Sequence, residues 1–173
     1  MTTRWVTGMF FNLAQSESAV AALEQRGLPR TAISVLMTDA TRSRHFRDAS
    51  ADTAADAEKA AEGAGVGGAV GGVIGATIAA VAAVGTVIAF PGLGLVVAGP
   101  LLAALAGGGA GAATGGFMGA LIGLGLSEDR AVYYEKGLQE GGILVGVSAK
   151  DEVEVGQFSA LLRDCGADEV RSS

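Results

Sequence analysis

A stretch of 64 residues, Gly63–Leu126, contains no Asp, Glu, Lys, Arg or His, and it constrains this chain more than any other feature. Within it, glycine recurs at every fourth residue in two blocks. The first block is Gly63, Gly67, Gly71 and Gly75, and the second is Gly107, Gly111, Gly115, Gly119 and Gly123. The stretch therefore indicates where the protein sits and how it assembles, and it displays no reaction.

The spacing of four residues predicts helices that pack through their glycine faces. Residues i and i+4 lie on one face of a helix, and small residues there let another helix approach closely. A glycine inside a helix costs about 0.5–1 kcal/mol relative to alanine, which close packing has to offset. A flexible linker is the alternative, but Val and Ile are interleaved through residues 73–88 and flexible linkers are polar. We therefore predict a glycine-zipper helical hairpin.

Prolines mark the ends of the two predicted helices. Pro91, followed by Gly92, should stop the first helix near residue 90, and Pro100 suits the first turn of the second. The helices are expected over residues 53–89 and 100–126. Each is long enough to cross a hydrocarbon core, which needs about 20 apolar residues. The second is poorly hydrophobic where Gly and Ala dominate, so that part suits burial against partner helices better than contact with lipid.

The flanks of the stretch predict an α/β domain. Strands are expected at residues 4–11 and 32–37, around a helix with Ser16 as a plausible N-cap, and such a βαβ unit favours parallel pairing. A polar loop should follow, and then a helix that runs from residue 48 into the zipper. Further elements are expected after the hairpin: a helix at 131–139, a strand at 143–147, a helix from Asp151 to about Gly166 and a strand at 169–171.

With the hairpin removed, four strands and two crossover helices match a ferredoxin-like order. The predicted fold class is therefore α+β: a ferredoxin-like βαβ/βαβ domain interrupted by a glycine-zipper hairpin of two membrane-type helices. Residues 1–47 and 127–173 would form the two halves of the domain, and residues 48–126 the hairpin. Each half is too small to bury much alone, so both should fold together.

Composition excludes some classes of function. The net charge of −6 disfavours general nucleic-acid binding. Cys165 is the single cysteine, which excludes an intrachain disulfide and a cysteine-based metal site, and it suits a small packed residue better than a nucleophile. The N-terminal residues lack a signal-peptide pattern, so the polar flanks are expected in the cytoplasm.

A basic cluster is the first candidate site. Arg42, Arg44 and Arg47 surround His45 just before the predicted hairpin, where they could contact anionic lipid headgroups. The alternative is a solvated loop whose arginines pair with Asp48 and Asp52.

Other patterns are weaker. The motif G-x-G-x-x-G at residues 63–68 follows a helical sequence instead of a strand, which favours packing over dinucleotide binding. Asp48, Asp52 and Asp56 share a helix face and could bridge a hard cation, although a solvated acidic face is commoner. We expect no catalytic residue, no metal and no cofactor. Trp5 suits the core, while for Tyr133 and Tyr134 the core and a headgroup boundary both stay open.

Two long runs, residues 4–36 and 90–149, are similar to bacterial general-stress proteins of the 17M-like type, including those labelled low-temperature-induced or heat-induced. The second run carries the Pro-Gly turn, the zipper, an acidic cap, a Tyr/Glu helix and a Gly-Gly-strand sequence. The resemblance covers nearly the whole chain, with residues 39–60 matching least. It implies a stress-linked, membrane-associated protein without established enzyme activity. A looser likeness is to a small two-span subunit of the quinol-oxidising alternative complex III.

The sequence thus leads to a structural, non-enzymatic protein whose hairpin inserts in the bacterial cytoplasmic membrane and drives homo-oligomerisation. The alternative is a soluble homo-oligomeric assembly, with hairpins packed in an apolar interior that binds or stores a lipid or a quinone.

Overall fold

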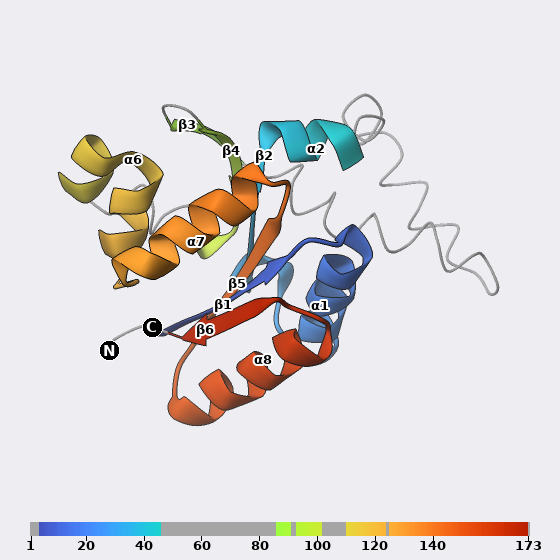
Figure 1. Cartoon of the computed structure of the whole chain (residues 1–173). Coiled ribbons are helices and arrows are strands. Elements are labelled where there is room, and N and C mark those ends of the chain that lie inside the picture. Colours follow the sequence, from blue (N-terminus) through green and yellow to red (C-terminus); the bar gives the residue numbers. More distant parts are fainter. Residues whose placement is uncertain (1–3, 46–85, 91–92, 102–109, 124, 173) are drawn as a thin grey trace.

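The described part of the chain forms an α+β fold around an antiparallel sheet of six strands, in the order β3-β4-β2-β5-β1-β6 (Figure 1). The computed structural model describes residues 4–45, 86–90, 93–101, 110–123 and 125–172. The strands are β1 Arg4–Phe10, β2 Ile33–Thr38, β3 Thr86–Phe90, β4 Leu93–Ala98, β5 Ile143–Ala149 and β6 Glu169–Ser172. The helices are α1 Leu13–Gln25, α2 Asp39–His45, α6 Ala110–Gly123, α7 Glu128–Gln139 and α8 Glu152–Asp164, with a short 3₁₀ helix at Arg30–Ala32.

The predicted parallel pairing of the first two strands is wrong, because β5 lies between them. Val147 of β5 is opposite Val6 of β1 on one side and opposite Ile33 of β2 on the other, and all five strand pairings are antiparallel. Both β1 and β2 are buried on both faces along most of their length. Interlocking the two halves of the chain gives each of these apolar strands a neighbour on both sides.

Two layers of helices cover the two faces of the sheet (Figure 1). Alternate residues of a strand point to opposite faces. Val6 and Phe10 of β1 therefore belong to the core under α1 and α8, while Trp5 and Met9 belong to the core under α6 and α7. Trp5 is 9% exposed, which confirms its prediction as a core residue.

The prediction of a helix through residue 89 is wrong where the structure describes the chain. Thr86–Phe90 and Leu93–Ala98 are strands that pair with each other, with Phe90 opposite Leu93, so Pro91 and Gly92 connect two strands and not two helices. β4 in turn pairs with β2, Val35 being opposite Ala98. The physical reason is local composition: Thr, Val, Ile and Phe favour strands over helices. The expected tip of the hairpin is thus part of the sheet.

The second predicted helix is present in part. Pro100 and Leu101 are helical, residues 102–109 lie outside the described chain, and α6 ends at Gly123. Inside α6, Gly116 has φ 59° and ψ −143°, a conformation that glycine adopts with ease and other residues rarely do. Gly111 and Gly115 precede this kink while Gly119 and Gly123 follow it. The kink interrupts a straight ridge of glycines along the second block.

Two local boundaries differ from the predictions for hydrogen-bonding reasons. Residues 39–45, expected as loop, form α2, where the Thr38 hydroxyl accepts a hydrogen bond from the Thr41 amide at 3.1 Å. Helix α1 begins three residues before Ser16, because Asn12 caps it by accepting a hydrogen bond from the Ala14 amide at 2.9 Å. The predicted start of a helix at Asp151 is confirmed: Asp151 is the N-cap of α8, and its side chain accepts a hydrogen bond from the Glu154 amide at 2.8 Å.

Candidate functional site

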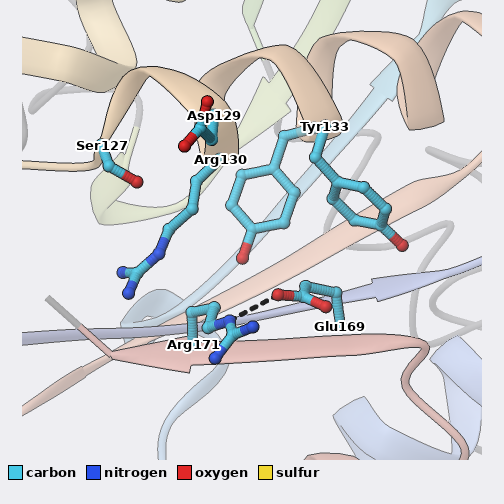
Figure 2. Close-up of a pocket in the computed structure, with 7 residues that line it drawn as sticks. Ser127, Asp129, Arg130, Tyr133, Glu169 and Arg171 are labelled. Carbon is cyan, nitrogen blue, oxygen red and sulfur yellow. Dashed lines mark hydrogen bonds and ion pairs between the residues drawn. The ribbon is translucent and has the colours of Figure 1, made fainter.

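A polar pocket of about 350 Å³ lies between the first half of α7 and the edge strand β6 (Figure 2). Its volume is near the lower limit of small-molecule sites. Figure 2 shows Arg130 extending from α7 toward the strand that carries Glu169 and Arg171. The lining residues are Ser127, Asp129, Arg130, Tyr133, Tyr134, Glu169 and Arg171.

The sequence places these side chains through the start and the register of α7. Ser127 is the extended N-cap, and its carbonyl accepts hydrogen bonds from the amides of Arg130 and Ala131 at 3.1 and 3.0 Å. Glu128 and Asp129 follow in the first turn, where negative charge complements the helix dipole. Ala131 is buried in the core beneath α7. The helical period then directs Arg130 and Tyr133 toward β6.

The two tyrosines of α7 are hydrogen-bonded in different surroundings. Tyr134 is fully buried, and its hydroxyl lies 2.8 Å from Thr7 Oγ1. For Tyr134 this answers the question left open by the sequence, since the residue belongs to the core. Tyr133 is half-buried, and its hydroxyl donates a hydrogen bond to a carboxylate oxygen of Asp168. The two rings meet edge to face, with centroids 5.8 Å apart and planes at 63°.

Both phenols are held in the neutral form. Burial raises the pKa of Tyr133, and the hydrogen bond to Asp168 and the charge of that carboxylate raise it further. Burial also raises the pKa of Tyr134, against a smaller opposing effect of its hydrogen bond with Thr7. Neither side chain is therefore prepared to act as a phenolate base or nucleophile at neutral pH.

The charged residues of the pocket balance one another. Arg171 pairs with Glu169, and Arg130 donates a hydrogen bond to the Ser172 carbonyl at 3.4 Å. With Asp129, the lining contains two guanidinium groups and two carboxylates. The pocket therefore selects neither an anion nor a cation by net charge, and its polar groups suit hydrogen bonding to a neutral or zwitterionic group.

The predicted basic cluster lies on α2, at the end of β2. Arg42 pairs with Asp39 at 3.1 Å, which offsets part of its charge. Arg44 is exposed and passes close to the turn after α7, where a Cβ on Gly141 would lie 3.3 Å from Arg44 Nη1. His45 is exposed, and Arg47 lies outside the described residues. The structure thus places Arg42 and Arg44 on one short helix, each near a different neighbour.

The remaining predicted sites fall in different places. The first glycine block, Gly107, the G-x-G-x-x-G motif and the three aspartates at 48, 52 and 56 lie outside the described residues. Cys165 is half-buried against the core under α1 and α8, and burial raises the pKa of its thiol. Its prediction as a packed residue is confirmed.

Glu17 was missed by the sequence interpretation. It is 4% exposed on α1, and within the described chain no hydrogen bond reaches its Oε1 atom. Burial raises the pKa of this carboxyl. A signal was available, because Glu17 falls between Leu13 and Val20 on the apolar stripe of the helix.

The described residues hold neither a cluster suited to a metal ion nor a helix suited to cross a membrane. They contain no group of three His, Cys, Asp or Glu side chains placed to hold an ion. In the same part of the chain, no helix combines the length and apolar sequence that a membrane crossing requires. Comparisons with protein-family models, curated proteins and solved structures find no match to this chain.

Proposed function

We propose that this chain is a non-enzymatic, membrane-associated protein that assembles into homo-oligomers. The observation that carries the proposal is that the described parts of the charge-free stretch belong to the α+β domain, whereas residues 63–85 lie outside the described residues. β3 and β4 extend the sheet, and Phe117 and Leu121 of α6 pack in the core. Residues 63–85 are equally free of charge and contain the first glycine block. Because residues 4–45 and 86–98 belong to one sheet, this segment would enter and leave the membrane on the same side.

Residues 63–85 would attach the protein to the cytoplasmic membrane, while the α+β domain stays in the cytoplasm. Small residues at every fourth position suit close helix packing in lipid, so the glycine block would join copies of the chain. The exposed Arg44 and the paired Arg42 support this placement. They lie on α2, shortly before residues 63–85, where basic residues favour anionic headgroups and a cytoplasmic location.

We also propose that the domain is ferredoxin-like. Four of its strands have the order β6-β1-β5-β2, with α1 joining β1 to β2 and α8 joining β5 to β6. Both connecting helices contribute to one core on one face of the sheet. The β3–β4 hairpin is then an addition beside β2. A role under stress is a further proposal, and its support is the resemblance to the general-stress proteins.

One observation favours the alternative of a soluble assembly with an apolar interior. The charge-free residues 93–98 are a strand of the domain, and Leu95, Val96 and Val97 are at most 2% exposed. Protein can therefore cover at least part of this stretch without lipid. If other copies cover the rest, the assembly would hold a lipid or a quinone inside.

Fractionation of the untagged protein from its host tests the proposal. Membranes are washed with high salt, then with carbonate, then with detergent. Release by detergent alone is expected, because residues 63–85 would sit in the hydrocarbon region. A large particle in the aqueous fraction would overturn the membrane proposal, and extraction of its contents for lipid or quinone would then test the alternative.

A matched pair of variants locates the attachment. Ile74→Lys places a charge within residues 63–85 and should shift the protein toward the carbonate-released fraction, since a charge in the bilayer centre costs about 3 kcal/mol. Val153→Lys makes the same change at a residue of α8 that is 66% exposed, and should leave the fractionation unchanged. Equal behaviour of both variants would contradict attachment through residues 63–85.

A further inference from the structure

The two edge strands of the sheet differ in how their backbone edges are protected. In the part of the chain that the structure describes, β6 pairs with β1 alone and β3 pairs with β4 alone. An edge strand presents a row of N–H and C=O groups to which another strand can add. Proteins block such addition with charged residues, prolines or covering side chains.

β6 carries several of these protections. Glu169 and Arg171 alternate along the strand and form an ion pair. From α7 above the strand, Arg130 donates a hydrogen bond to the Ser172 carbonyl at 3.4 Å. Tyr133 binds Asp168 just before the strand begins. A second strand arriving at β6 would have to displace side chains and oppose charges.

The sequence of β3 lacks the first two of these protections. Thr86–Phe90 reads TVIAF, without a charged residue or a proline. Thr, Val, Ile and Phe are among the residues with the highest strand preference. An uncharged edge strand in which four of five residues are of this kind is a template for strand addition.

We propose that β3 is the interface on which β3 of a second copy adds in antiparallel orientation, so that one sheet continues through two subunits. This inference rests on the proposed self-assembly and assigns it a surface. A two-fold axis perpendicular to the sheet leaves each face of the sheet on the same side in both copies. Residues opposite each other must then lie on the same face, so their positions differ by an even number. One residue therefore lies on the axis, opposite its own copy. With Ile88 at the axis, all five residues pair: Thr86 with Phe90, Val87 with Ala89.

A second copy fits this edge better than an unrelated peptide. The pairing centred on Ile88 opposes no charges, and it places an aromatic residue opposite a β-branched one, a favourable cross-strand pair. The chain therefore supplies a partner strand that matches its own edge. The surface buried by one pairing of five residues is well below the roughly 1,600 Å² of a standard interface. The contact should therefore be weak unless residues 63–85 bring the copies close together.

Single-cysteine cross-linking of the full chain tests the inference. Cys165→Ser removes the native thiol, and single cysteines are then placed at positions 86 to 90 in turn. Cross-strand neighbours lie about 4.5–5.5 Å apart between Cα atoms, which suits a disulfide. With an added thiol oxidant, Ile88→Cys should give the most covalent dimer, at least about 5-fold above cysteines at positions 87 and 89. Only the residue on the axis lies opposite its own copy, whereas positions 87 and 89 lie opposite each other. Ser172→Cys on β6 is the matched control and should remain uncross-linked.

The outcomes separate this inference from the proposed function. A dimer or larger oligomer that cross-links at none of positions 86–90 would overturn the β3 interface and leave self-assembly intact. Stronger cross-linking at Ser172→Cys than on β3 would move the interface to the other edge and overturn the inference. A chain that stays monomeric at every concentration, in water and in detergent, would overturn both.

Discussion

A Cβ atom at position 99 would lie 2.2 Å from the carbonyl oxygen of Ile33, so Gly99 sits directly on the backbone of β2. The contact joins the charge-free stretch to the α+β domain just after β4. It is supported by the neighbouring hydrogen bond from the Leu101 amide to the buried Ser34 hydroxyl at 3.0 Å. The anchoring of this stretch therefore depends on a residue without a side chain.

Gly99→Ala should destabilise the domain by at least about 2 kcal/mol, since it combines left-handed backbone strain with a clash against main-chain atoms. Gly27→Ala is the matched control, because both glycines have φ +88° and nothing lies within 4 Å of the Cβ position at residue 27. The control should cost about 1 kcal/mol, from strain alone. Urea unfolding followed by circular dichroism measures both. Equal losses would show that the contact with Ile33 relaxes at no cost.

The Tyr134–Thr7 hydrogen bond should be worth about 1 kcal/mol. Tyr134→Phe and Thr7→Val each remove one partner and leave the other buried, so each should lower the free energy of unfolding by about 1–2 kcal/mol. Thr7→Val also removes the 3.5 Å hydrogen bond from the Thr7 hydroxyl to the Arg171 carbonyl, so it should cost more than Tyr134→Phe. The double variant should lose little more than Thr7→Val alone, because that change already leaves the Tyr134 hydroxyl unpaired. Losses that simply add would contradict coupling between the two hydroxyls.

Hydrophobic patterning was enough to predict much of the α+β domain. Local sequence correctly placed the strands near residues 4–10, 33–38 and 143–149 and the helix that begins at Asp151. The pairing was not predictable in the same way. The insertion of β5 between β1 and β2 follows from burial of both strands on both faces, and that is a property of the assembled sheet.

The charge-free stretch misled the prediction for a physical reason. Glycines at every fourth residue indicate a helix, and the predicted helix continues past the last of them to residue 89. Over residues 86–90 the β-branched residues indicate a strand instead. The pocket between α7 and β6 was beyond sequence reasoning, since it joins Arg130 to residues about 40 positions later in the chain. Tyr133 and Tyr134 were noted, but Asp168 and Thr7 as their partners depend on tertiary contacts.

Glu17→Gln should stabilise the protein at neutral pH. Burial raises the pKa of this carboxyl above its ordinary 4.5, so the folded state holds its proton more tightly than the unfolded chain does. The stabilising effect of that proton is complete below about pH 4.5 and is lost as the pH rises through the pKa of the folded state. The variant, which cannot ionise, should gain about 1 kcal/mol over the parent at pH 7 and less at pH 4.

Urea unfolding at several pH values between 4 and 7 measures the effect of Glu17→Gln. Glu140→Gln is the control, because Glu140 is exposed and its 3.9 Å pair with Lys136 is a surface pair of small value. A gain for Glu17→Gln that is the same at every pH would contradict an origin in ionisation.

Gly71→Leu should weaken assembly while the α+β domain stays folded, because a bulky side chain on the glycine face separates packed helices. Gly115→Leu tests the second block in the same way, although Gly116 kinks α6 beside it. Gly156→Leu is the matched control, since this glycine of α8 is exposed and nothing lies within 4 Å of its Cβ position. It should assemble like the parent and unfold at slightly higher urea, because leucine favours a helix by about 0.5–1 kcal/mol over glycine.

The mass of each variant, measured in detergent, decides between the two glycine blocks. Loss with Gly71→Leu alone would assign assembly to residues 63–85, whereas parent-like masses for both variants would refute glycine packing as the force that joins the copies.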